Sequence, residues 1–109
     1  MSTKSPECWT SDPQAEALRI EVTPERSLLL PHDQFMFARL TGDGDDQQLK
    51  LVFAAHEVLI RGLNLQRIET GMQRKNLSLV IKLPSHQRSL IEEGQPVVLE
   101  ITVKEAKSD

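Results

Sequence analysis

Residues 34–54 read QFMFARLTGDGDDQQLKLVFA, two runs of apolar and β-branched or aromatic residues around an Asp/Gly cluster. Aromatic and aliphatic side chains favour a pleated strand, whereas Gly supplies positive φ and Asp bonds its own backbone in tight turns. The segment therefore predicts a β-hairpin, with one strand over 34–40 and the other over 48–54.

Strands are also predicted on both sides of this hairpin. Apolar and polar residues alternate strictly over 18–23, the period of a half-buried strand, and 77–83 and 97–103 are further strand-like runs with an apolar residue at every second position. Residues 27–30, just before Pro31, fit either an edge strand or an extended loop. After Phe53 the apolar positions change from odd to even numbers, which predicts a turn at 55–57 and a separate strand over 57–61.

One amphipathic helix is expected between residues 64 and 75. Leu65, Ile68 and Met72 have the spacing of a single apolar stripe. Asn64 is the expected N-cap, and Asn76 is expected to leave the helix in the left-handed conformation. A second, short helix is predicted from residue 85 to residue 93, before Gly94.

This order of elements favours an α+β fold: a small, mostly antiparallel sheet of about six strands with one amphipathic and one short helix. A partly open β-barrel capped by a helix is the alternative. At 109 residues the chain has room for one domain, expected over 17–104.

The two ends are expected to lie outside that domain. Residues 1–16 are polar and predict a disordered leader, with Cys8 as an exposed or disordered thiol, and 105–109 predict a frayed tail. The lone cysteine cannot form an internal disulfide. The sequence has neither a signal peptide nor an apolar run long enough to span a membrane, so a soluble cytoplasmic protein is expected.

Charge is distributed unevenly along a chain whose net charge is −3. Residues 61–91 hold six basic side chains against one acidic side chain, Glu69, and the remaining sequence is acidic overall. These candidates for binding an anion or a partner are Arg61, Arg67, Arg74, Lys75, Lys82 and Arg88. Such a segment can present an electropositive surface although the whole chain is acidic.

Helical spacing places Arg67, Thr70 and Arg74 opposite the apolar stripe, facing outward. The alternative is an ordinary solvated face, neutralised by acids elsewhere in the fold: Glu21, Glu92, Glu93 and Glu100. Nucleic acid is a possible partner, disfavoured by the acidic total and by the lack of interleaved aromatic residues for base stacking.

No cofactor or metal site is expected. The three histidines, His32, His56 and His86, are too far apart for a local ligand motif, and the acidic turn 43–46 lacks the spacing of a calcium loop. Nucleophile and phosphate-loop motifs are absent from the sequence. A ligand-binding or hydrolase-like domain would have to use His56 and Glu57.

The sequence therefore favours a non-enzymatic module that binds another protein or pairs with itself as a homodimer. Strands 18–23 and 97–103 are the expected sheet edges, which invite such pairing. Val80 and Val98 interrupt the polar faces of their strands and predict a second, shallow apolar surface. Recognition of an anion or nucleic acid by segment 61–91 is the first alternative function, and the small ligand-binding or hydrolase-like domain is the second.

Overall fold

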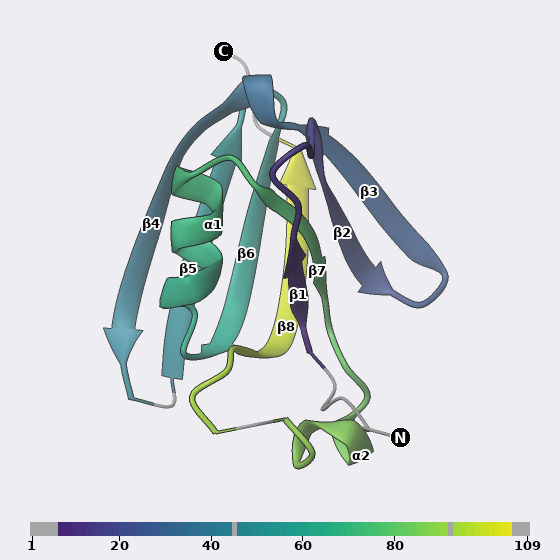
Figure 1. Ribbon diagram of the computed structural model, residues 1–109, viewed down its shortest axis with the longest axis vertical. Helices are drawn as coiled ribbons and strands as arrows, with labels where there is room; N and C mark the ends of the chain where they lie inside the picture. Colours follow the sequence, from purple (N-terminus) through teal and green to yellow (C-terminus); the bar gives the residue numbers. More distant parts are fainter. Residues whose placement is uncertain (1–6, 45, 92, 106–109) are drawn as a thin grey trace.

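The structure is a computed structural model that describes residues 7–44, 46–91 and 93–105. Its strands form two four-stranded sheets (Figure 1). In order, the first sheet contains β1 (Trp9–Ser11), β7 (Leu77–Ile81), β2 (Ala17–Thr23) and β3 (Arg26–Pro31). The second contains β4 (Phe35–Asp43), β5 (Asp46–Phe53), β6 (His56–Leu63) and β8 (Val97–Glu105).

Antiparallel pairing predominates, as expected, and among the described strands only β2 and β7 pair in parallel. The mixed α+β composition is therefore confirmed, and the 34–54 hairpin is present as β4 and β5. The expected single sheet of about six strands is wrong, because a short 3-10 turn (His32–Gln34) carries the chain from one sheet to the other. Alternation marks strands but does not say which strands pair. Neither sheet closes into a barrel.

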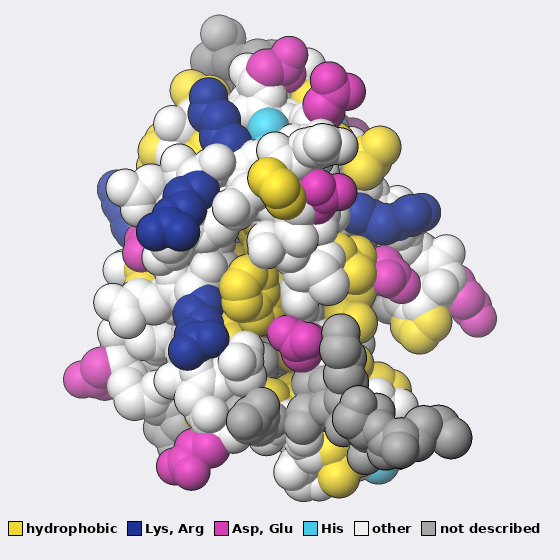
Figure 2. All heavy atoms as spheres, in the orientation of Figure 1, with side chains coloured by type: hydrophobic (Ala, Val, Ile, Leu, Met, Phe, Trp, Pro, Cys, Tyr) yellow, Lys and Arg dark blue, Asp and Glu magenta, His cyan; other side chains and the backbone are white. Residues whose placement is uncertain are grey.

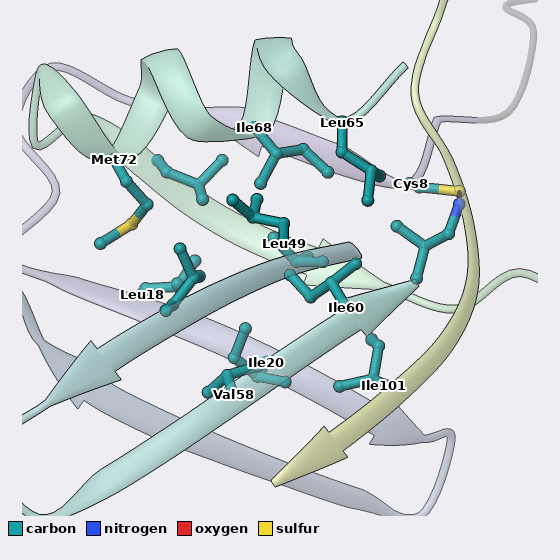
Figure 3. Close-up of a cluster of buried hydrophobic side chains, with 14 of the residues drawn as sticks. Cys8, Leu18, Ile20, Leu49, Val58, Ile60, Leu65, Ile68, Met72 and Ile101 are labelled. Carbon is teal, nitrogen blue, oxygen red and sulfur yellow. Dashed lines mark hydrogen bonds between the residues drawn. The ribbon is translucent and has the colours of Figure 1, made fainter. Parts of the chain in front are cut away.

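The core lies between the first sheet and α1 (Gln66–Gln73) on one side and the second sheet on the other. Figure 3 shows aliphatic side chains from β2, β5, β6, β8 and α1 pointing into this space. Burial of each such side chain stabilises the fold by about 1.5–3 kcal/mol. The labelled members are all buried: Cys8, Leu18, Ile20, Leu49, Val58, Ile60, Leu65, Ile68, Met72 and Ile101.

The N-terminal segment differs from the expected disordered leader. Residues 9–11 form β1, the Cys8 side chain is fully buried, and the Ile81 amide donates to the Cys8 carbonyl at 2.8 Å. The Val98 amide also donates to Cys8 Sγ at 3.4 Å. Burial raises the pKa of this thiol. The polar composition of 1–16 hid the burial of Cys8 and the packing of Trp9 against the core. Residues 1–6 lie outside those described.

Two ladder irregularities explain why the expected apolar surface at Val80 and Val98 is wrong. Both side chains are fully buried. The β6–β8 register shifts between Arg61 and Gly62, and the β1–β7 register shifts between Thr10 and Ser11. A bulge changes which residues face inward, so strict alternation predicts the wrong face beyond it.

Helix α1 is confirmed but is shorter than the predicted 64–75. Asn64 does not cap it: this residue has φ of 55°, and its side-chain amide donates to the Gln95 carbonyl. The Leu65 amide instead donates to Gln47 Oε1 at 2.8 Å, a cap supplied by β5. The chain leaves the helix through Lys75, with φ of 58°, one residue earlier than expected.

The remaining boundaries also change. Strand β7 ends at Ile81 instead of residue 83, and the second helix, α2 (Ser85–Arg88), stops well before residue 93. Strand β2, over residues 17–23, lies inside its sheet, so its assignment as an edge is wrong. The edges are β1, β3, β4 and β8, and the predicted edge at 97–103 is confirmed.

Candidate interaction surfaces

The basic segment forms a surface only around α1. Arg67 and Arg74 are exposed on the outward side of the helix, about 10 Å apart along its axis, and Lys75 follows them. Figure 2 shows Lys and Arg side chains gathered over this helix. Among the residues that the structure describes, none of these three cations takes part in an ion pair. We call these three residues the α1 basic surface.

The other three candidates lie elsewhere. Arg61 is on the outer face of the second sheet, where its Nε is 3.4 Å from Asp46 Oδ1. Arg88 is partly buried and donates from Nε to the Leu83 carbonyl and from a terminal nitrogen to the Leu99 carbonyl. Lys82 is exposed beyond the end of β7 that lies farther from α1. The six basic residues of the segment therefore do not form one continuous surface, because the segment spans a helix and two different sheets.

The counter-charges also differ from expectation. Within the described ranges, Glu21, Glu93 and Glu100 form no ion pair with a basic side chain, although Arg61 lies opposite Glu100 in the β6–β8 register. Glu92 lies outside the described residues. The only ion pairs there join Lys50 to Glu57 and Arg61 to Asp46.

The outer face of the second sheet carries a diagonal apolar stripe. Phe37 lies opposite Val52, and Leu59 is the diagonal neighbour of Val52 on β6. Phe37 is 46% exposed and Leu59 is 36% exposed. The charged pair Lys50 and Glu57, 2.9 Å apart, lies on the same face, and the hydrogen bond from Lys50 lowers the pKa of Glu57.

Strand β4 forms one margin of this sheet. It is nine residues long, and it carries the exposed Met36, at 64%, next to Phe37. Acidic side chains lie at its end, where Asp43 pairs in register with Asp46. The C-terminal end of α1 lies at its start, because Gln73 and Phe35 line one groove of about 340 Å³.

The three histidines lie in different parts of the fold: His32 in the 3-10 turn, His56 on β6 and His86 on α2. His32 is buried, with Nε2 2.8 Å from the Leu77 carbonyl and Nδ1 without a hydrogen-bond partner. His86 is exposed on α2. No group of three or more His, Cys, Asp or Glu side chains in the described part of the chain is arranged to hold a metal.

His56 and Glu57 do not form the expected site. They are consecutive residues of β6, so their side chains point to opposite faces, and Glu57 is paired with Lys50 on the outer face. The register instead places His56 opposite Glu105 on β8. Sequence reasoning missed this pair because 49 positions separate the two residues and only the ladder joins them.

Comparison with known proteins leaves the chain without a family. No protein-family model, curated protein or solved structure matches it. Its function must therefore be inferred from these surfaces. Among the helices of the described residues, none is long and apolar enough to cross a membrane.

Proposed function

We propose that this protein is a non-enzymatic interaction module that pairs with a second copy of itself through the free edge of β4. The observation that carries the proposal is a nine-residue edge strand with exposed Met36 and Phe37 and neither Pro nor Lys along its length. Edge strands expose unpaired backbone groups, and Pro or Lys commonly protects them against pairing. The features of β4 that would oppose pairing are one exposed arginine, Arg39, and a register irregularity near Met36.

Charge complementarity supports a second copy as the occupant. Antiparallel pairing of β4 with itself brings the start of each strand next to the end of the other, as a two-fold axis requires. The acidic end of one copy, at Asp43, then lies near Arg74 of the other copy. Arg74 is the cation to test, because Lys75 lines a hollow that also contains Asp33 and Glu16.

Sedimentation equilibrium and light scattering test the proposal directly. The expected mass is twice the chain mass of 12.3 kDa, with a concentration-dependent return to monomer. Phe37→Lys places a charge on the margin and should weaken the dimer at least about tenfold, since Lys is unfavourable in a buried strand contact. Leu59→Lys is the matched control, because Leu59 is a similarly exposed apolar residue two strands away from the edge.

A charge-swap pair tests the orientation. Asp43→Lys and Arg74→Glu should each weaken the dimer, and the double variant should recover it, with effects of up to about 1 kcal/mol for an exposed pair. A monomer at the highest soluble concentration contradicts the proposal. Disruption by Leu59→Lys but not by Phe37→Lys would place the contact on the sheet face instead.

A second candidate function is the recognition of an anionic partner by the α1 basic surface. It is favoured by the exposure of Arg67, Arg74 and Lys75 without an ion pair in the part of the chain described. Nucleic acid is the probe, because its binding has a defined salt dependence: three phosphate contacts give a slope of log K against log salt of about −3. Arg67→Glu with Arg74→Glu should abolish binding, and absence of binding at low salt contradicts this candidate.

A further inference from the structure

On the inner face of the β6–β8 ladder, the last cross-strand pair is ionisable, whereas the pairs before it are apolar. The preceding inward-facing pairs are aliphatic: Val58–Val103 and Ile60–Ile101. The last pair joins His56 and Glu105. Residues directly opposite each other in antiparallel strands have Cβ atoms about 5 Å apart. Two ionisable side chains therefore lie together at the place where the aliphatic core ends.

The first sheet extends beyond this point. Figure 1 shows the β2–β3 hairpin reaching past β8, the outermost strand of the second sheet on that side. The resulting cleft between the hairpin and the second sheet has a volume of about 340 Å³. We call it the hairpin cleft, and its lining residues come from both sheets: Val22, Arg26, Ser27, Leu28, His56, Val103 and Glu105.

The cleft has an apolar floor and a charged rim. Val22, Leu28 and Val103 are partly buried and pack against the core. Arg26, His56 and Glu105 make no side-chain hydrogen bond or ion pair with any other described residue. Apolar surface with a few converging polar groups is the usual composition of a small-molecule site.

We propose that the hairpin cleft binds an α-amino acid with an apolar side chain, as the zwitterion. Arg26 would receive the carboxylate, for which its planar guanidinium is well suited, and Glu105 would receive the ammonium group. The aliphatic side chain of the ligand would cover Val22, Leu28 and Val103. A ring nitrogen of His56 can donate to the carboxylate.

Charge complementarity selects this ligand class over simpler ones. A ligand that carries only an anionic group would leave Glu105 without a partner, and a ligand that carries only a cationic group would leave Arg26 without one. Leaving either charge unpaired in a partly desolvated site costs binding free energy. A zwitterion satisfies both groups. The volume lies at the lower end of the range for ligand pockets, about 300–1,000 Å³, which suits a single amino acid.

Titration followed by NMR of the methyl groups and amides tests the proposal, with L-leucine as the probe. We expect shifts at Val22, Leu28, Val103 and His56, with a Kd of about 1 mM. 4-Methylpentanoate lacks the ammonium group and 3-methylbutylamine lacks the carboxylate, so each should bind at least about tenfold more weakly. Equal binding of either probe would overturn the assignment of a zwitterion.

Three variants locate the contact. Arg26→Gln and Glu105→Gln should each weaken leucine binding about tenfold, whereas Arg67→Gln, at an exposed arginine of α1 that does not line the cleft, should leave it unchanged. Binding that survives both cleft substitutions overturns the proposal, as does the absence of shifts at about 10 mM leucine. The Phe37→Lys variant should bind leucine normally, so this proposal and the β4 dimer fail independently.

Discussion

The second sheet has two edge strands, β4 and β8, which we call its margins. They differ in their contacts with the rest of the protein. Strand β8 is held by distant parts of the chain: Cys8 accepts from the Val98 amide, Gly62 lets β6 approach closely, and β2 lies beside it. Strand β4 packs against α1 and the core through Phe35, Ala38 and Leu40. Its Met36 and Phe37 are exposed. We therefore expect substitutions that disturb β8 to affect stability most, and substitutions at the exposed residues of β4 to affect the proposed dimer most.

The largest expected effect is at Gly62, on the β8 side. A Cβ at this position would lie 1.9 Å from the Val97 carbonyl oxygen, which is backbone and cannot move aside cheaply. Gly62→Ala should therefore lower the free energy of unfolding by at least about 3 kcal/mol, measured by urea denaturation. Gly44→Ala is the control: it has no neighbour within 4 Å, and only its φ of 63° is unfavourable, which costs about 1–2 kcal/mol. Equal losses of unfolding free energy for the two variants would contradict the inference that close backbone packing at Gly62 fixes β8 in place.

The next largest effect on stability is expected at Cys8, which connects the N-terminal segment to β8. Cys8→Ala should lower the free energy of unfolding by about 1 kcal/mol through lost burial and the lost Val98 contact. In the native protein the buried thiol should react with a disulfide reagent only as fast as the chain opens locally. Labelling at the rate of an exposed thiol would show that the segment is not held against β8.

The pH dependence of that contribution has a definite sign. Burial raises the pKa of Cys8 above its ordinary value of 9.0. Below 9.0 the thiol is protonated in both states and its contribution is fully present. As pH rises from 9.0 through the raised folded value, the unfolded chain releases the proton first and stability falls. This alkaline loss should be absent in Cys8→Ala.

A smaller effect is expected on the stability of the monomer when β4 is changed. Phe37→Lys should alter the free energy of unfolding of the monomer by no more than about 0.5 kcal/mol, because the side chain is 46% exposed. The measurement is denaturation at a concentration where the protein is monomeric. A loss as large as that of Gly62→Ala would mean that β4 supports the fold, and the contrast between the margins would disappear.

The smallest effect on stability is expected from the Lys50–Glu57 ion pair, on the outer face of the second sheet between β4 and β8. The hydrogen bond from Lys50 lowers the pKa of Glu57, so the pair contributes stability above the ordinary glutamate pKa and loses it as pH falls through the lowered value. The side chains of Lys50 and Glu57 are 42% and 34% exposed, so solvent screening keeps this contribution small. The difference between the wild type and Glu57→Gln should decrease on acidification and should be weakened by salt.

Local sequence was informative wherever neighbouring residues control the structure. The hairpin of β4 and β5 follows from its Asp/Gly cluster, and the apolar stripe of α1 from Leu65, Ile68 and Met72, all of which are buried. The exposure of Arg67 and Arg74 follows from the same helical spacing. These features depend on contacts between residues only a few positions apart, so the sequence carries them directly.

The candidate site was less predictable. Arg61, Arg67 and Arg88 belong to one basic segment, yet Arg61 lies beside Asp46 and Arg88 donates to backbone carbonyls, whereas Arg67 forms no ion pair within the described part of the chain. His56 was expected beside Glu57, but the ladder places it opposite Glu105. Each outcome depends on which strands share a sheet, which alternation within a single strand does not encode.

The sequence by itself determined the strands with clear apolar alternation, the amphipathic helix and the polarity of its two faces, because these arise from local periodicity. It did not reveal β1, whose residues are polar apart from Trp9. Only the tertiary structure decided the division into two sheets, the burial of Cys8 and Val98, and the convergence of His56 and Glu105 with Arg26. The physical reason is that register, bulges and close backbone approach are set by long-range packing. A one-residue shift in pairing changes the face of every residue that follows.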